Sequence, residues 1–280
     1  MIPPWLGYRI ASITADWIAA HREWKMVRAL RANQWVVHGG KLTKEELDHA
    51  VRDTLRNTGR SIFDLNHYIH YPKAISQLIV PSPATYSLLQ RPVFTKRGLL
   101  LVGLHLSNFD FILQSGYLKG LNALVLTIAE LQGGYRLQYE MRKKIGIHIV
   151  PASVSSLRAA VNHLQTGGVV LTGIDRPDSK SIYRPRFFNH PAMLPVHHIF
   201  LALKAMVPIV MMTVILQSDG KYHLLSTDPI EMQSHPDRRE EVVQNAEVIL
   251  RIAENFIRLA PHQWSMPLPV WPDILNQVPE

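Results

Sequence analysis

The nine residues GLHLSNFDF, at positions 103–111, contain a histidine and an aspartate whose spacing could support acid–base chemistry. Histidine titrates near neutral pH, and a carboxylate that binds one ring nitrogen leaves the other nitrogen as a basic acceptor. On one ideal helix, residues five positions apart point about 140° away from each other. His105 and Asp110 can therefore meet only if the chain bends between them.

The local sequence supplies such a bend. An apolar run predicts a strand over 99–104, directly before His105, and Ser107 is well placed to cap a helix that follows. With Ser107 at the N-cap, Asp110 takes the third helical position, from which its side chain can point back toward His105. The same Ser-x-x-Asp spacing is also a capping box, so the alternative is that these residues serve only the helix start.

The elements that must position this pair alternate along the chain. From residue 98 onward, short apolar runs alternate with amphipathic stretches, which predicts an α/β sheet covered by helices. Such sheets bind ligands at the carboxyl ends of their strands, where His105 lies. The predicted strands span 99–104, 123–128, 147–150, 169–172, 208–216 and 222–226, and the predicted helices span 107–119, 134–145, 155–165, 195–206 and 236–259.

Residues 1–95 form a predicted helical segment ahead of the α/β domain over 96–280. Its first helix, over 5–37, carries tryptophans and apolar residues at helical spacing. A basic flank recurs at every third position, at Arg22, Lys25, Arg28 and Arg31. Such a helix either packs on the core with a solvated face or lies at a bilayer interface, where Trp, Lys and Arg concentrate. A capping box at 43–46 begins a second helix that runs to about residue 68.

Composition sets the outer limits. A chain of 280 residues with 47% hydrophobic residues can bury a sizeable core, and the absence of cysteine removes disulfides, thiolate metal sites and a cysteinyl acyl-enzyme. A net charge of +8 implies attraction to polyanions, which include nucleic acid, an anionic bilayer and phosphorylated substrates. No stretch predicts a signal peptide or a membrane-spanning helix.

The motif HLSNFD resembles the H-x4-D motif of the glycerolipid acyltransferase superfamily, and the downstream chain resembles its lipid A and mannolipid acyltransferase branch. VLTIAE, ending at Glu130, is similar to a strand of that branch that ends in an acidic residue. GIDRP at 173–177, the FFN-x5-P segment at 187–195 and APHQW at 260–264 follow in the family's order. In place of the family's glycine after the two phenylalanines this chain has Asn189, and bulkier residues, Val196, His197 and His198, follow the proline.

The resemblance implies a glycerol-3-phosphate acyltransferase-like fold with a mixed central sheet. It implies transfer of a fatty acyl group from acyl-CoA or acyl carrier protein to a hydroxyl of a membrane glycolipid or lysophospholipid, with no cofactor. His105 would be the general base, oriented by Asp110, and Glu130 would support His105 or contact the acceptor. The enzyme would work at the cytoplasmic side of the cell membrane as a peripheral or monotopic protein, without nucleic acid or metal.

The predicted substrate-binding residues are Asn108, Asp175, Arg176, Arg186, Phe187 and Phe188. Arg176 and Arg186 belong to a basic loop that could hold the phosphates of coenzyme A, an acidic carrier protein or an acceptor phosphate, and 142–144 is a second basic cluster. The two phenylalanines could line an acyl channel. The alternatives are solvated charge for the basic residues and core packing for the phenylalanines.

Two other functions fit parts of the sequence. A metal-dependent hydrolase is suggested by His190, His197 and His198 near Asp175, although adjacent residues on one helix cannot both face one site and no H-E-x-x-H pattern is present. A non-catalytic protein that binds a membrane surface or nucleic acid is compatible with the positive charge, but the basic residues are scattered and form no recognisable nucleic-acid module.

Overall fold

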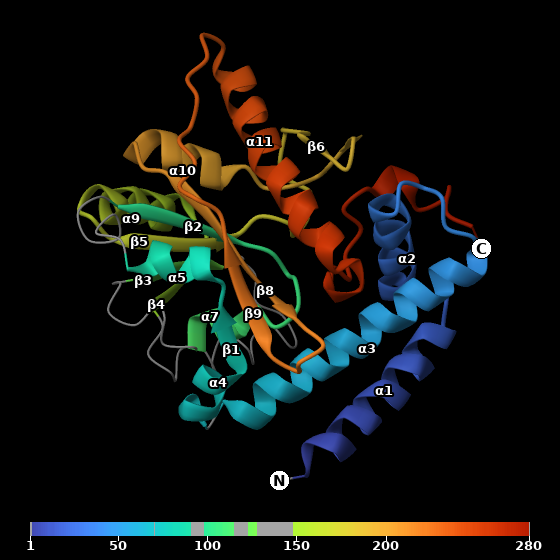
Figure 1. The fold of residues 1–280 in the computed structure, drawn as a ribbon. Coiled ribbons are helices and arrows are strands. Elements are labelled where there is room, and N and C mark those ends of the chain that lie inside the picture. Colours follow the sequence, from blue (N-terminus) through green and yellow to red (C-terminus); the bar gives the residue numbers. More distant parts are fainter. Residues whose placement is uncertain (1, 70, 91–97, 115–122, 128–147, 280) are drawn as a thin grey trace.

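A seven-stranded sheet with helices on both faces occupies the centre of the part of the chain that the structure describes, residues 2–69, 71–90, 98–114, 123–127 and 148–279 of a computed structural model (Figure 1). The strands are β1 (Ile79–Pro81), β2 (Leu99–Gly103), β3 (Ala123–Thr127), β4 (His148–Pro151), β5 (Val169–Gly173), β8 (Ile209–Leu216) and β9 (Tyr222–Ser226). A separate two-stranded hairpin joins β6 (Arg186–Phe187) and β7 (His190–Pro191).

The sheet is mixed, as expected, with the strand order β1-β9-β8-β2-β5-β3-β4. Strands β8, β2, β5, β3 and β4 are parallel, whereas β9 runs antiparallel to β8, and β1 pairs in parallel with β9. The five parallel strands therefore end at one common edge. The helices are α1 (Pro4–Ala20), α2 (Lys25–Val37), α3 (Lys44–Tyr68), α4 (Pro72–Leu78), α5 (Pro83–Leu89), α7 (Asp110–Gln114), α9 (Val154–Gln165), α10 (His197–Ala205) and α11 (Arg238–Leu259).

Strand β2 shows why the sheet is buried on both faces. Successive side chains of a strand point to opposite faces, so Leu99 and Leu101 join one core cluster while Leu100 and Val102 join another. All four residues are almost completely buried. A continuous apolar run is the expected pattern for a parallel strand covered by helices on both faces. This burial fixes β2 rigidly, and β2 leads directly to His105.

The prediction of one helix over 5–37 is wrong, because the chain turns at 21–24 between α1 and α2. No proline or glycine marks this turn. The turn places the ring of Trp24 against the rings of Trp17 and His21 and allows α2 to enter the core, where most of its residues are buried. Arg31 consequently leaves the predicted solvated flank: it is 5% exposed and binds the Asp48 carboxylate and the Pro279 carbonyl.

Helix α1 lies along α3 at the periphery of the molecule, away from the sheet (Figure 1). A Cβ at Gly7 would lie 2.0 Å from the Phe63 ring, so glycine permits the close approach of the two helices. The Tyr8 hydroxyl donates to the Asp64 carboxylate at 2.7 Å, and the same carboxylate accepts a hydrogen bond from Tyr222 of β9. These contacts tie α1 through α3 to the sheet.

The opposite face of α1 carries large apolar side chains that remain exposed, namely Trp5, Ile10, Ile13 and Trp17. Within the described ranges, no helix combines the length and the apolar character needed to cross a bilayer.

Two features were absent from the sequence-based prediction. Strand β1 lies in a stretch predicted to be a helical connection, and the hairpin β6–β7 lies in a predicted loop. The predicted boundary between residues 95 and 96 falls outside the described residues, so the division into two domains stays a prediction.

Candidate functional site

The site is built where β2 and β5 end side by side. In the register of these parallel strands, Gly103 is the partner of Gly173, the last residue of each strand. His105 and Asp175 each follow two residues later, so the two chain segments bring them to equivalent positions at the carboxyl edge of the sheet. The sequence carried this signal as the paired endings Gly-Leu-His and Gly-Ile-Asp, but it can be used only once the two strands are known to be neighbours.

Asp175 holds His105 with both carboxylate oxygens. The Nδ1 atom of His105 lies 2.7 Å from Oδ1 of Asp175, and the backbone N–H of His105 donates to Oδ2 at 2.8 Å. Asp175 is fully buried, whereas the His105 side chain retains 24% of its exposure. Asp175 was predicted to bind substrate. In the structure both oxygens of its carboxylate are hydrogen-bonded to His105, and the side chain is buried from solvent.

Electrostatic interactions favour an ionised Asp175. Burial alone would favour the protonated carboxyl group, but the charge of His105 and the hydrogen bonds from His105 and Trp264 outweigh it and lower the pKa of Asp175 below its ordinary value. An ionised carboxylate can only accept hydrogen bonds, so Nδ1 of His105 carries the shared hydrogen. In the neutral ring the lone pair then lies on Nε2, which is the nitrogen that can accept a proton.

The segment 260–265 closes around this pair. The indole Nε1 of Trp264, a fully buried side chain, donates to Oδ2 of Asp175 at 2.8 Å. The backbone N–H of Ser265 donates to the His105 carbonyl at 2.9 Å, and the N–H of Ser107 donates to the Gln263 carbonyl at 2.8 Å. The turn at residues 105–107 is therefore held on one side by Asp175, which follows β5, and on the other side by the segment 260–265. APHQW is part of the resemblance to the family, but Trp264 had no predicted role.

The turn between His105 and Asp110 has a different form from the predicted one. Helix α7 begins at Asp110, so Ser107 is not its N-cap; Ser107 instead has a left-handed φ of 51°. Asp110 stands at the first helical position and is 4% exposed. The nitrogen Nδ1 of His105 is hydrogen-bonded to Asp175. That Asp110 orients His105 therefore stays a prediction. Asn108, a predicted substrate-binding residue, is 3% exposed and donates to the Ser61 carbonyl of α3.

The other predicted residues are spread more widely. Arg176 follows Asp175 directly and is half-buried, and Arg186 is exposed on β6 with its backbone N–H bonded to Glu247. Phe187 is fully buried and stacks on Trp271 at 5.4 Å between ring centroids, which makes it a core residue and favours the packing alternative over an acyl channel. Glu130 and the basic cluster at 142–144 lie outside the described residues.

The FFN segment explains one departure from the family pattern. Asn189 has a φ of 64°, in the left-handed region where glycine is easiest and asparagine is the best-tolerated alternative. Phe188 shares this conformation with a φ of 50°, its N–H donates to Glu254 at 2.6 Å, and Arg258 lies over its ring. Asparagine is thus compatible with the left-handed backbone at position 189.

The histidines of the metal-hydrolase alternative do not converge. His197 shares a hydrogen bond of 2.8 Å between its Nε2 and the Thr172 hydroxyl, and His198 is 1% exposed with neither ring nitrogen bonded to any described residue. Burial lowers the pKa of His197 to about 4 and lowers the pKa of His198 well below its ordinary value. Across the described ranges, no three side chains of His, Cys, Asp or Glu gather as a metal site would require.

The lowered pKa values of the half-buried His197 and the buried His198 predict a loss of stability in acid. Because their folded-state pKa values lie below the unfolded value near 6.5, the unfolded chain binds more protons as the pH falls through 6.5. For His197 alone, the shift from 6.5 to about 4 corresponds to roughly 3 kcal/mol of unfolding free energy lost by pH 4. His198→Leu removes one of the two groups and is expected to flatten the decline, with stability at pH 7 unchanged or higher.

Urea unfolding of the wild type and His198→Leu between pH 7.5 and 4.5 measures this decline. His49→Gln, which changes an exposed histidine on α3, is the matched control. Equal slopes for the wild type and His198→Leu would contradict the assignment of a neutral, buried His198.

One of the comparisons with known proteins identifies the family of this chain. A family model described as bacterial lipid A biosynthesis acyltransferase matches residues 2–272. A comparison with curated proteins finds no match. The family match covers nearly the whole chain, including the strand ends that carry His105 and Asp175 and the segment that carries Trp264. The chain therefore belongs to the bacterial lipid A biosynthesis acyltransferase family, an acyltransferase family whose membership implies acyl transfer to a lipid.

Proposed function

We propose that this protein transfers a fatty acyl group from a thioester donor, acyl-CoA or acyl carrier protein, to a hydroxyl group of a membrane glycolipid or lysophospholipid. The single observation that carries the proposal is the bond between Nδ1 of His105 and the buried, ionised carboxylate of Asp175 at the carboxyl edge of the sheet. This bond leaves Nε2 of a partly exposed histidine as a basic atom in a protein of the acyltransferase family.

The chemistry needs one base and no covalent enzyme intermediate. Nε2 of His105 accepts the proton of the acceptor hydroxyl as its oxygen attacks the thioester carbonyl carbon. The new carbon–oxygen bond forms, the carbon–sulfur bond then breaks, and His105 returns the proton to the leaving sulfur. Asp175 keeps the ring in the reactive tautomer and stabilises the imidazolium, as the aspartate of a serine triad does, while the acceptor takes the place of the serine.

The remaining predicted residues have proposed roles beside the His105–Asp175 pair. Asp110 and Glu130 remain candidate catalytic carboxylates, and Arg176 and Arg186 remain candidate ligands for a donor or acceptor phosphate. Arg176 has the stronger position, because it is joined directly to Asp175. Phe187 is better explained as part of the aromatic cluster with Trp264 and Trp271.

We also propose that the exposed face of α1 rests on the membrane that holds the acceptor. Trp5, Ile13 and Trp17 are 65%, 63% and 57% exposed, and apolar side chains gathered on one helix face mark an interaction surface. Arg9 lies exposed on the same helix, and the net charge of +8 favours anionic lipid. The opposite face of α1 is held to α3 and, through Asp64, to the sheet.

Replacing two of these tryptophans tests the membrane surface. Trp5→Ser with Trp17→Ser is expected to weaken binding to anionic vesicles at least about tenfold, because each buried aromatic side chain contributes roughly 2 kcal/mol. Vesicle sedimentation of the full chain measures the partition coefficient. Tyr86→Ser, which removes an equally exposed aromatic side chain on α5, is the control. Undiminished sedimentation of the double variant would exclude α1 as the membrane contact.

The reaction itself is tested with purified full-length protein. Acyl-CoA and acyl carrier protein donors are offered with lipid acceptors that carry a free hydroxyl, and mass spectrometry detects the acylated product and the released thiol. Transfer from at least one donor is expected. Folded protein that transfers from neither donor to any lysophospholipid, glycolipid or lipid A precursor would refute the proposal.

A further inference from the structure

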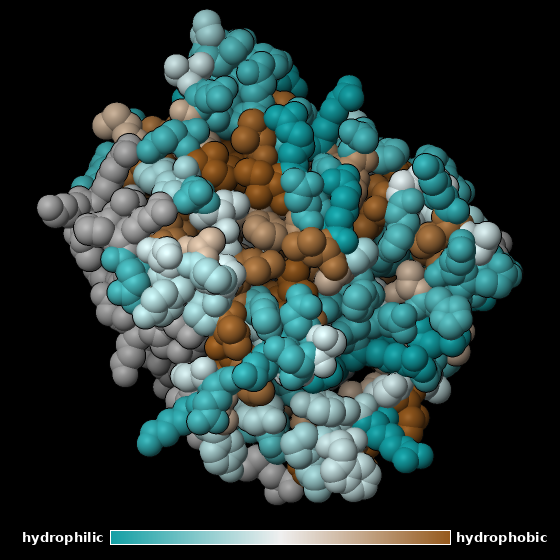
Figure 2. Space-filling model, in the orientation of Figure 1, coloured by the Kyte–Doolittle hydropathy of each residue, from teal (hydrophilic) through white to brown (hydrophobic). Residues whose placement is uncertain are grey.

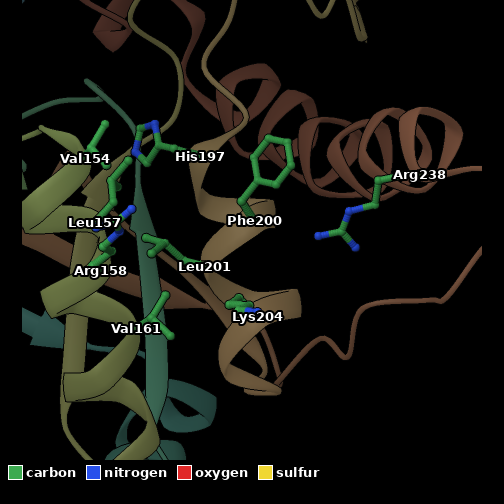
Figure 3. A pocket seen from close by; sticks show the side chains of 9 residues that line it. All are labelled: Val154, Leu157, Arg158, Val161, His197, Phe200, Leu201, Lys204 and Arg238. Carbon is green, nitrogen blue, oxygen red and sulfur yellow. The ribbon is translucent and has the colours of Figure 1, made fainter.

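A cavity lies apart from His105, between helices α9 and α10. Its volume is about 330 Å³, and one face of each helix lines it (Figure 3). Val154, Leu157 and Val161 come from α9, and Phe200 and Leu201 come from α10. The three α9 positions are three or four residues apart and so share one side of that helix, opposite the apolar wall of α10. Figure 2 shows that apolar side chains reach the surface beside α10 and α11, flanked by hydrophilic ones.

The polar side chains that line this groove include three cations and no carboxylate. Arg158 stands on α9, Lys204 on α10 and Arg238 at the start of α11. Among the described residues, Arg158 and Lys204 form no ion pair with an acidic side chain. Arg238 binds Glu241 and also lies over the Phe200 ring, 5.8 Å from its centroid. Positive charge is thus concentrated around an apolar hollow.

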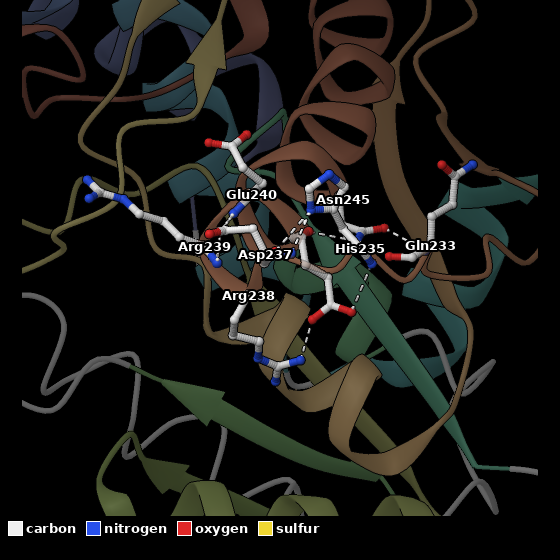
Figure 4. Close-up of polar contacts among 8 residues, drawn as sticks. Gln233, His235, Asp237, Arg238, Arg239, Glu240 and Asn245 are labelled. Carbon is white, nitrogen blue, oxygen red and sulfur yellow. Dashed lines mark hydrogen bonds and ion pairs between the residues drawn. The ribbon is translucent and has the colours of Figure 1, made fainter.

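The start of α11 is fixed, which fixes the backbone position of Arg238. Asp237 caps the helix by accepting hydrogen bonds from the N–H groups of Arg239 and Glu240, both at 2.8 Å (Figure 4). Asn245 ties the preceding loop by hydrogen bonds with the backbone of Gln233. Arg238 therefore extends toward the groove from a rigid element.

We propose that this groove binds a single-chain lipid anion, an alkyl chain with one carboxylate or phosphate head. The apolar walls accept the chain, and each buried methylene contributes about 0.8 kcal/mol. Arg158 or Lys204 donates charge-assisted hydrogen bonds to the head, and Arg238, which is bonded to Glu241, lines the same groove. The volume of about 330 Å³ stands at the small end of ligand pockets, roughly 300–1,000 Å³, and suits a slender chain better than a two-chain lipid.

The groove is separate from the reacting histidine but adjacent to it. None of His105, Asp175 and Trp264 lines it. One of its lining residues, His197 (Figure 3), is bonded to Thr172. The next residue, Gly173, packs against the catalytic ring, since a Cβ there would lie 3.5 Å from Cε1 of His105. The binding proposal does not depend on the proposed acyl transfer, because binding is measured without any reaction.

Calorimetry with three probes tests the chemistry of the ligand. Decanoate supplies chain and charge, decanol supplies the chain alone and acetate supplies the charge alone; decyl phosphate compares the two head groups. Decanoate or decyl phosphate is expected to bind at least about tenfold more tightly than decanol, and acetate not measurably. Equal affinity for decanol and both anionic probes, or binding of acetate as tight as decanoate, would overturn the proposal.

Two kinds of variant locate the binding site. Arg158→Glu with Lys204→Glu reverses the charge, and Val161→Trp fills the groove from α9. Each is expected to weaken decanoate binding at least about tenfold, while Lys41→Glu with Lys221→Glu, a matched reversal of two exposed lysines elsewhere, leaves it unchanged. If the double glutamate variant does not unfold cooperatively on heating, the double variant Arg158→Gln with Lys204→Gln is used in its place. Affinity within twofold of wild type in both the charge and the filling variants would overturn the site.

Discussion

Replacing His105 with alanine is expected to lower kcat/KM for acyl transfer by about 10²- to 10⁴-fold, because the acceptor hydroxyl would lose the proposed general base. The alanine retains the backbone N–H that binds Asp175, so the turn keeps one of its two contacts with that carboxylate. Mass spectrometry of the acylated lipid under single-turnover and steady-state conditions gives the rates. Circular dichroism and thermal unfolding show whether the fold persists.

His49→Ala, on the exposed surface of α3, is the control for a histidine change elsewhere. It is expected to leave the rate within about twofold of the wild type. Full activity of a folded His105→Ala protein would remove the general base from the mechanism.

Replacing Asp175 with asparagine is expected to lower kcat by about 10²- to 10⁴-fold, with a much smaller change in KM. The amide preserves the shape of the side chain but carries no charge, so it would not stabilise the imidazolium that the proposed mechanism forms in the transition state. It can also donate to Nδ1, which would leave the proton on Nε2, the nitrogen that must be free to accept one. Asp178→Asn, in the same loop, is the matched control.

Comparison of Asp175→Asn with Asp110→Asn separates the two proposed carboxylate partners. A large loss of kcat in Asp175→Asn at near-constant KM supports the hydrogen bond that the structure contains. If Asp110→Asn loses far more activity than Asp175→Asn while both proteins fold, then Asp110 is the carboxylate that orients the histidine and Asp175 does not fill that role.

Much of the sheet could be predicted, because each central strand is an apolar run bounded by polar or flexible residues. The runs at 99–104 and 169–172 match β2 and β5 within a residue or two. Short strands were harder to predict from the sequence. Strand β1 has three residues and its partner β9 lies far along the chain, so nothing local distinguishes β1 from a helical connection. The break between α1 and α2 was hidden for a similar reason, since the burial of α2 depends on partners such as residues 266–270.

The candidate site was predicted only in part. His105 was predictable because it follows an apolar run, but the predicted partner was the nearby Asp110. Asp175 comes seventy residues later and reaches His105 only because β5 pairs with β2 in a particular register. Trp264 comes later still and was visible only as part of a motif. Non-local pairing therefore decided which of two plausible aspartates binds Nδ1 of the histidine.

The segment 260–265 binds the His105–Asp175 pair, so the site can be completed only after this late part of the chain has been synthesised. During synthesis, β2 and β5 leave the ribosome well before Trp264 does. His105 is therefore synthesised early, but the hydrogen bond from Trp264 to its partner Asp175 forms late. We expect a chain still in translation, or one cut by a protease ahead of residue 260, to be inert toward lipids.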